Sequence, residues 1–305
     1  MKKEKKTKRE SNYRLYVLCA VPVILVFIFN YLPMIGAVIA FKDYKYNDGI
    51  FGSKWVGLRN FEMFFKSKDF ANVAWNTIYL NFIFIIIGTI CAVTLAILLF
   101  NVVGRKNVKT YQTIFITPYF LSWVVVGYIA YSFLNPAYGI LNQLLNALGL
   151  GNIDVYSKPG LWPIILTIAN VWKNVGMDSV IYYAALMGID TSLFEAADVD
   201  GVNRFQKVWY ITIPSLISLI TILTILKIGN IFRADFGLFY QLTRDVGQLY
   251  STTDVMDTYI YRTLKVWNDV SLSSAAGLLQ SVVGFVLVIV TNTVTKRIDK
   301  DCALF

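Results

Sequence analysis

Hydrophobic residues gather in six long runs of roughly 20 residues, and segments rich in charged and turn-forming residues separate them. A helix of this length crosses a hydrocarbon core of about 30 Å at about 1.5 Å per residue. The pattern therefore predicts an all-α, polytopic membrane protein with six transmembrane helices. The expected helices cover residues 15–41, 75–100, 111–133, 161–187, 213–232 and 275–294.

The composition supports this prediction without any motif. Hydrophobic residues make up 56% of the chain and charged residues 15%, whereas a soluble domain carries about 25% charged residues. So few polar side chains cannot cover a soluble globule of 305 residues. The excess apolar surface is expected to face lipid.

The distribution of positive charge along the chain predicts its orientation in the membrane. Residues 1–14 hold seven of the 28 basic residues and come directly before the first apolar run. Segments 101–110 and 295–305 are also basic and short, and a basic excess in short loops marks the cytoplasmic side. Both termini are therefore expected inside the cell, with segments 42–74, 134–160 and 233–274 outside. A nucleic-acid arm is the rival interpretation of the basic N-terminus, but no basic patch with interleaved aromatics extends it.

The chain organises around these helices without a soluble domain. Residues 1–14 are expected to be a basic cytoplasmic tail, and residues 15–74 a first transmembrane helix with its extracellular loop. Residues 75–294 form a denser five-helix core that contains a cytoplasmic loop at 190–214. Residues 295–305 are a second cytoplasmic tail.

No catalytic or metal-binding pattern is present. The chain has no histidine, and Cys19, Cys91 and Cys302 lack metal-ligand spacing, so a histidine-based zinc site and a Ser-His-Asp triad are excluded. It also lacks a GxxxxGK phosphate-binding loop. The sequence therefore predicts a protein that is not an enzyme, without catalytic residues, bound metal or cofactor.

The loop at 190–214 carries the most specific pattern. Ser192 and Glu195 have capping-box spacing, and Gly201 stands where a helix commonly ends in a left-handed residue. This predicts a helix of about two turns whose apolar face holds Leu193, Ala196 and Ala197. Such a face either docks on a partner protein or lies flat against lipid headgroups.

A family resemblance favours the partner. Glu195, Ala196, Ala197, Gly201, Ile211, Ile213 and Pro214 match the EAA---G---------I-LP signature of binding-protein-dependent ABC permeases, with isoleucine for leucine at position 213. The stretches WVGLRNFEMFF, WNTIYLNF, YGILNQLLNALGL and TTDVMDTYIYR resemble the carbohydrate-uptake subclass of this family. The opening FKDYKY and GSKWVGLRNF resemble permeases that import oligosaccharides released from complex polysaccharides or glycans.

The resemblance implies a type I ABC importer permease fold in the cell membrane and a set of partners. These are a second homologous permease chain, a dimer of ATPase subunits that bind the ATP and Mg²⁺, and an extracellular solute-binding protein. The loop then corresponds to the coupling helix that docks on the ATPase. The coupling residues implied are Ser192, Leu193, Phe194, Glu195, Ala196, Ala197, Asp200, Gly201 and Pro214.

Polar side chains in the fourth expected helix mark a second candidate site. At 100° per residue, Asn170, Lys173, Asn174 and Asp178 fall within an arc of roughly 140°, so one helix face is polar at membrane depth. Such side chains usually face a bundle interior or a watery cavity, although a hydrogen-bonded helix seam gives the same pattern. The predicted substrate-path residues, which are amides, a carboxylate and aromatic rings, are Asn170, Asn174, Asp178, Tyr182, Tyr119, Trp123, Asn230 and Gln280.

The predicted function is therefore the transmembrane permease subunit of an ATP-driven importer for a carbohydrate, in particular an oligosaccharide. An ion-coupled secondary transporter and an ABC permease for a non-sugar solute are the alternatives. A secondary transporter predicts internal repeats in both halves, which the sequence does not show. A membrane-embedded enzyme would need the clustered catalytic residues that are missing.

Overall fold

The computed structural model describes the backbone of residues 2–298 and the side chains of residues 13 and 15–296. Residues 299–305 of the predicted C-terminal tail, including Cys302, lie outside the described residues. The chain divides into two compact units. The first consists of the described parts of Met1–Lys66 with Thr263–Leu278, and the second of Ser67–Arg262 with the described part of Leu279–Phe305. The prediction of an all-α fold is confirmed.

The first unit begins with a long helical stretch. Helix α1 (Lys2–Val26) continues through a π-helical turn, η1 (Phe27–Tyr31), into a 3-10 segment, η2 (Leu32–Phe41). The expected first span at 15–41 is therefore helical throughout, although the helix begins well before the span. Pro33, in the first turn of η2, removes one backbone donor, which accounts for a change of helical geometry near this point.

A small folded segment follows in the first unit. Strand β1 (Lys42–Asp43) pairs with the antiparallel strand β2 (Lys54–Trp55), and α2 (Gly49–Gly52) lies between them. The side-chain amide of Asn60, in α3 (Arg59–Lys66), donates to the carbonyls of Ala40 and Lys42 at 2.9 Å each. This buried amide fixes the start of the loop that follows the first span.

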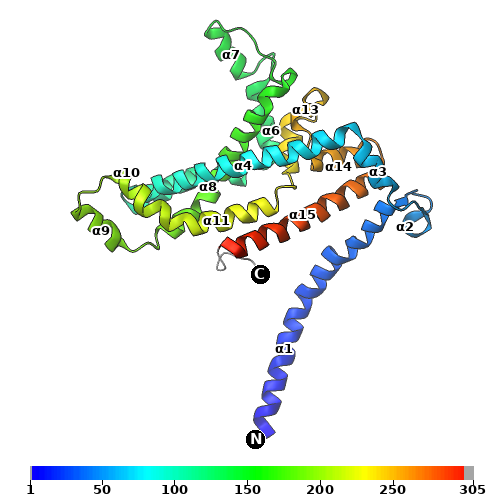
Figure 1. Cartoon of the computed structure of the whole chain (residues 1–305), viewed down its shortest axis with the longest axis horizontal. Helices are drawn as coiled ribbons and strands as arrows, with labels where there is room; N and C mark the ends of the chain where they lie inside the picture. Colours follow the sequence, from blue (N-terminus) through cyan, green and yellow to red (C-terminus); the bar gives the residue numbers. More distant parts are fainter. Residues whose placement is uncertain (1, 299–305) are drawn as a thin grey trace. The chain divides into compact units, whose positions relative to one another are not determined.

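Three long helices form the centre of the second unit. Helices α4 (Lys68–Phe100), α8 (Trp162–Leu186) and α11 (Ile213–Gly229) run side by side and contact one another (Figure 1). Ser67 caps α4 by accepting from the amide of Phe70. The buried core includes Trp162, Leu166 and Leu80.

Shorter elements complete the chain. They are α5 (Arg105–Ile116), η3 (Thr117–Phe120), α6 (Trp123–Leu134), α7 (Ile140–Ala147), η4 (Val155–Ser157), η5 (Pro159–Leu161), α9 (Thr191–Val199), α10 (Arg204–Lys207), η6 (Val208–Thr212), α12 (Phe236–Thr243), η7 (Gly247–Leu249), α13 (Tyr250–Thr253), α14 (Met256–Lys265) and α15 (Val270–Ile298).

The number of membrane-crossing helices is not confirmed as six. Within the described residues, four helical stretches are long and apolar enough to span: Leu15–Phe41, Lys68–Phe100, Arg204–Gly229 and Val270–Lys296. The bent pair Arg105–Phe120 and Trp123–Leu134 makes a fifth if it counts as one span. Helix α8, with 25 residues, is about 37 Å long and long enough to span, but its polar side chains make it less apolar than the others.

The second and sixth expected spans lie within longer helices, Lys68–Phe100 and Val270–Lys296, and the fifth and third differ more from the expectation. The fifth begins at Arg204 and ends at Gly229 instead of covering 213–232, because the chain turns at Asn230. The third is not one helix, since its two halves meet at an angle of 95°. Pro118 lies in the 3-10 turn before the bend, where it lacks an amide and cannot continue α-helical bonding. Ser122 then caps α6 by accepting from the amide of Val125.

The backbone groups freed by this bend are satisfied from α8. The ammonium group of Lys173 lies 2.7 Å from the carbonyl oxygen of Tyr119, 2.5 Å from that of Leu121 and 3.5 Å from that of Pro118. One turn further along α8, Gly176 allows close backbone contact, because an added Cβ would lie 2.0 Å from the Phe115 carbonyl oxygen. Lys173 and Gly176 therefore attach α8 to the broken helix.

The first testable prediction concerns this attachment. Lys173→Met keeps the length of the side chain but leaves the carbonyls of the bend without this donor, and hydrogen bonds to charged groups contribute about 1.5–3 kcal/mol each. Because at least two such bonds are lost, we expect the free energy of unfolding to fall by at least ~3 kcal/mol, measured by equilibrium unfolding in mixed detergent and SDS. Lys158→Met, at an exposed position, is the matched control. Equal stability of the two variants would contradict the role of Lys173.

Candidate functional site

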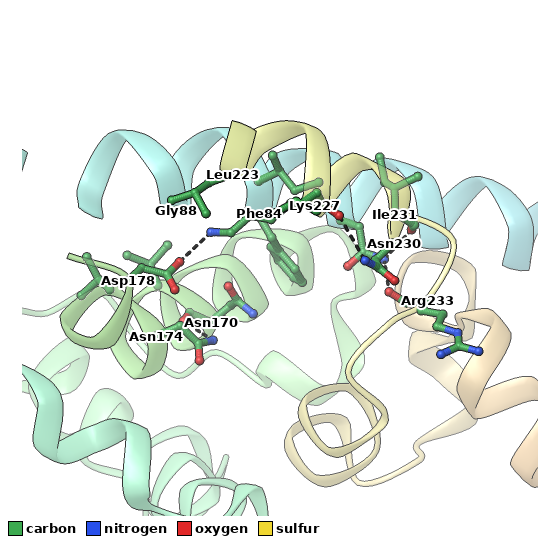
Figure 2. A pocket seen from close by; sticks show the side chains of 15 residues that line it. Phe84, Gly88, Asn170, Asn174, Asp178, Leu223, Lys227, Asn230, Ile231 and Arg233 are labelled. Atoms are coloured by element: carbon green, nitrogen blue, oxygen red, sulfur yellow. Dashed lines mark hydrogen bonds and ion pairs between the residues drawn. The ribbon is translucent and has the colours of Figure 1, made fainter. Parts of the chain in front are cut away.

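A cavity of about 480 Å³ opens among α4, α8, α11 and the turn after α11 (Figure 2). Its polar lining consists mainly of amides and charged groups, and its apolar lining comes from α4, α8, α11 and the turn after α11. The lining residues are Asn81, Phe84, Ile85, Gly88, Asn170, Val171, Asn174, Val175, Asp178, Leu223, Leu226, Lys227, Asn230, Ile231 and Arg233. The cavity thus collects polar groups that lie far apart in the sequence.

Helix α8 contributes a polar row to the cavity. Asn170, Asn174 and Asp178 follow one another at intervals of four residues, which places them on one face of the helix. The Asn174 amide nitrogen donates to the Asn170 carbonyl oxygen at 3.0 Å. Lys173, which shares the predicted arc, points elsewhere, because its ammonium group binds the bend in the third span. Of the four polar residues predicted to share one face, Asn170, Asn174 and Asp178 therefore line the cavity, and Lys173 lies in the contact between α8 and the broken helix.

An ion pair crosses the cavity from α8 to α11. The Asp178 carboxylate and the Lys227 ammonium lie 2.6 Å apart, and their side chains keep 31% and 34% of their accessible surface. Figure 2 shows the two side chains directed at each other, with Arg233 at the far end of the cavity. The pair neutralises both charges, which otherwise would be costly at membrane depth.

Lys227 was not among the sequence candidates. The signal that could have identified it is a lysine within the apolar run ITILTILKIGNIF, since an ionisable residue inside a span usually has a functional role. Asn81 was missed as well. Its amide donates to the carbonyls of Ile231 and Arg233 at 2.8 and 3.0 Å, and so fixes the turn after α11 against α4.

Four predicted substrate-path residues lie away from this cavity. Tyr182 is buried in the core between α4, α8 and α11. Gln280 donates to the carbonyl of Phe232 and to the carboxylate of Asp257, at 3.0 and 2.9 Å. Tyr119 and Trp123 lie beside the bend, with ring centroids 5.5 and 5.3 Å from the Lys173 nitrogen. Of the eight predicted residues, the cavity brings together Asn170, Asn174, Asp178 and Asn230, and a role of the other four in substrate passage stays a prediction.

The second candidate site, the loop 190–214, contains the expected short helix, α9. Its cap differs from the prediction. Asp190, and not Ser192, caps the helix, and its carboxylate accepts from the Ser192 amide at 2.9 Å. This hydrogen bond lowers the pKa of the Asp190 carboxyl group below its usual value. A true capping box occurs further on, where Asn203 and Gln206 bond reciprocally at the start of α10.

The faces of α9 also differ in part from the expectation. Ala197 is buried, and Phe194 packs on Phe100 with ring centroids 5.7 Å apart. The exposed residues of the helix include Ser192, Leu193, Glu195, Ala196, Asp198 and Val199, with Asp200 at its C-cap. Half of the Leu193 surface is exposed, so another molecule can pack against this side of α9.

The turn after α9 agrees with the prediction. The fifth span, in contrast, does not begin at Pro214, because helical backbone precedes it. Gly201 has a φ of +72°, with open space around its missing Cβ. The ammonium of Lys207 forms an ion pair with the carboxylate of Asp198, which attaches α9 to α10. Pro214 lies in the first turn of α11, but helical backbone already begins at Arg204 and passes through the π-helical turn η6.

Comparison with known families identifies the chain. The family model described as a binding-protein-dependent transport system inner membrane component matches residues 80–300. The chain belongs to this family. The matched region contains every residue that lines the cavity and the whole loop 190–214, so both candidate sites lie within the membrane component that the family shares.

Curated relatives of this permease cover most of its length. Protein LplB of Bacillus subtilis (strain 168) is 33% identical over 287 residues, which cover 94% of this chain and 90% of LplB. The polygalacturonan/rhamnogalacturonan transport system permease protein YteP of the same organism is 32% identical, covering 94% of this chain and 89% of YteP.

Solved structures agree with the fold of the permease. A bacterial ABC transporter involved in the import of the acidic polysaccharide alginate has a chain with TM-score 0.86 and 32% identity, covering 96% of this chain and 98% of that chain. A bacterial alginate ABC transporter in complex with an alginate pentasaccharide-bound periplasmic protein gives TM-score 0.85 and 32% identity, with 96% and 97% covered. The type I ABC permease fold is therefore shown.

The second prediction tests the ion pair of the permease. Asp178→Asn or Lys227→Met leaves one half-buried charge without its partner, and each should lower stability more than the double variant does, because the double variant leaves no unpaired charge. We expect a coupling energy above about 1 kcal/mol from a double-mutant cycle of unfolding.

The exposed pair Glu62 and Lys66 is the control, because its atoms are also 2.6 Å apart and such helix pairs contribute only about 0.3–0.5 kcal/mol. A coupling no larger than that of the control would show that Asp178 and Lys227 do not depend on each other.

Proposed function

We propose that this chain is the permease subunit of an ABC importer and that it passes an oligosaccharide through the cavity among α4, α8 and α11. The amide-rich lining of this cavity supports the proposal. Asn170, Asn174 and Asn230 offer both donors and acceptors, and sugar hydroxyl groups need both. The two N–H groups of Asn81 bind the turn after α11, so Asn81 offers its amide oxygen. The paired charges of Asp178 and Lys227 offer further hydrogen-bonding atoms without a net charge.

The named cargoes of similar proteins favour a carbohydrate. YteP is described as a transporter of polygalacturonan and rhamnogalacturonan, and the alginate importer carries an acidic polysaccharide. Both cover nearly the whole of this chain at 32% identity. We infer that the cargo is an oligosaccharide from such a polymer rather than a non-sugar solute.

ATP hydrolysis is assigned to other chains. The exposed side of α9, including Leu193, Glu195 and Ala196, is proposed to dock on an ATPase subunit that binds ATP and Mg²⁺. The other proposed partners are a second permease chain and an extracellular binding protein. The family description and the periplasmic protein in the alginate complex support the binding protein. This chain itself is proposed to carry no catalytic site.

The contacts of α9 connect it to two helices that line the cavity. Phe194 packs on Phe100, the last residue of α4, and Asp198 pairs with Lys207 at the start of the stretch that becomes α11. Because α4 and α11 both line the cavity, a displacement of α9 by the ATPase would move two of its walls. The proposed mechanism is alternating access, in which ATP binding drives the cavity toward the outside.

The proposed orientation follows the charges. Both termini and the loop 190–214 are placed in the cytoplasm, because the short basic segments lie on that side. This arrangement puts α9 on the side where ATP is available.

The third prediction tests the function with the whole complex. Affinity purification of this chain should recover an ATPase and a second permease chain. In proteoliposomes the complex should take up an oligosaccharide only with ATP inside and the binding protein outside. Uptake by the purified chain alone, driven by an ion gradient, would overturn the proposal in favour of a secondary transporter. Uptake of a non-sugar solute and of no saccharide would contradict the cargo.

The fourth prediction tests the coupling loop. Gly201→Trp places a large ring beside α9 at a left-handed position and should block docking. We expect at least a tenfold loss of binding-protein-stimulated ATPase activity in a complex that still reaches the membrane. Gly149→Trp is the matched control, because Gly149 also has a left-handed backbone, with φ +74°, and open surroundings, and lies in a different loop. Wild-type activity in Gly201→Trp would contradict the assignment of α9.

A further inference from the structure

A second, smaller pocket of about 190 Å³ lies between α6 and α12, outside the cavity described above. Its lining consists of Val124, Gly127, Tyr128, Tyr240, Gln241 and Arg244. None of these residues belongs to the candidates from the sequence. The volume is below the range of about 300–1,000 Å³ for drug-sized ligands, so it suits a single sugar residue of a longer chain.

The two helices that form this pocket are held at backbone contact. A Cβ added to Gly127 of α6 would lie 2.8 Å from the Gln241 carbonyl oxygen of α12, and one added to Gly237 would lie 2.5 Å from the Trp123 ring. The Trp123 indole nitrogen also donates to the Asp235 carboxylate at 2.6 Å, and Asp235 caps α12. The close contacts at Gly127 and Gly237 therefore hold α6 and α12 together on both sides of the pocket.

Arg244 supplies the charge of the pocket. It ends α12 in a left-handed conformation, with φ +56°, and Asp245 follows with φ +52°. Such backbone costs energy for residues other than glycine. The Arg244 guanidinium lies over the Tyr131 ring, with its central carbon 4.0 Å from the ring centroid, an arrangement that favours a cation electrostatically.

The neighbouring carboxylate does not neutralise Arg244. Asp245 instead lies 3.5 Å from Arg262 and accepts from the Tyr250 hydroxyl group at 2.9 Å. Among the residues that the structure describes, no carboxylate forms an ion pair with Arg244. The guanidinium therefore keeps its in-plane donors for a ligand.

The rest of the pocket fits a sugar ring. Tyr128 exposes 67% of its surface, and the Tyr240 ring is held by Phe236 and Tyr261, with centroids 5.0 and 5.1 Å away. Aromatic faces pack on the C–H surface of a sugar, and the Gln241 amide can bond its hydroxyl groups. Arginine binds a carboxylate through two parallel hydrogen bonds. Together these groups match a sugar that bears a carboxylate.

We propose that the pocket between α6 and α12 is a saccharide subsite that selects uronic-acid residues of the transported oligosaccharide, with Arg244 binding the carboxylate. The proposal rests on the proposed function and narrows its cargo to acidic oligosaccharides. In the first cavity, Asp178 already neutralises the ammonium group of Lys227, so Lys227 does not provide this selection, and Arg233 lies at the far end of that cavity.

The experiment measures uptake by proteoliposomes that hold the complete importer with its binding protein. The probes are trigalacturonate and the neutral trisaccharide obtained by reducing its carboxyl groups. Arg244→Gln should lower trigalacturonate uptake at least tenfold and raise its KM, while uptake of the neutral probe changes less than twofold. Arg244→Lys, which keeps the charge but not the paired donors, should retain more uptake than Arg244→Gln. Arg105→Gln, at an exposed arginine of α5, should leave uptake of both unchanged.

Other outcomes separate this proposal from the proposed function. Uptake of neutral saccharides alone by the wild-type complex, or equal losses of both probes in Arg244→Gln, would overturn the uronate subsite and leave the importer intact. Uptake of no saccharide by the wild-type complex would overturn both. If Arg244→Gln fails to assemble, Tyr128→Ala tests the same pocket without changing Arg244 or Tyr131. It should lower trigalacturonate uptake at least fivefold, and unchanged uptake would overturn the subsite.

Discussion

The arrangement of the second unit depends on one ammonium group, that of Lys173, and the three backbone carbonyls around it. A broken helix at membrane depth exposes carbonyls that have no water to bond, and each costs several kcal/mol if it stays unpaired. Lys173 supplies donors from a neighbouring helix, and Gly176 lets the two backbones meet. The 95° bend between Arg105–Phe120 and Trp123–Leu134 can therefore exist only where α8 lies.

Helix α8 also positions the polar side chains of the cavity. Lys173 faces the bend, while Asn170, Asn174 and Asp178 face the space between α4 and α11. A rotation of α8 that improved one contact would disturb the other, because both belong to one rigid helix. The polar residues of α8, which make it the least apolar of the long helices, are thus used on two sides. This explains why a helix so rich in polar groups is stable beside lipid-facing neighbours.

Much of this arrangement could be predicted from the sequence, and the limits have physical causes. Apolar runs show where helices form, so every expected span is at least partly helical. The break near Leu121 was missed, because Pro118 is compatible with a kinked but continuous helix, and only the distant Lys173 decides between them. Asn170, Asn174 and Asp178 were found through their helical spacing. Lys227 was missed because its meaning depends on Asp178, 49 positions earlier in the chain, and helical spacing cannot indicate that pairing.

Four basic side chains of the second unit differ in the groups that surround them. Lys173 is surrounded by carbonyls, Lys227 by one carboxylate, and Arg262 by Asp254 and Asp245. Each of these charges is satisfied within the fold, so a ligand would have to displace an existing partner in order to use it. Arg244 is held by an aromatic ring instead. A ring fixes the plane of a guanidinium without using its in-plane donors. An anion can therefore bind Arg244 without breaking a contact of the protein, which distinguishes a charge available for recognition from charges that maintain structure.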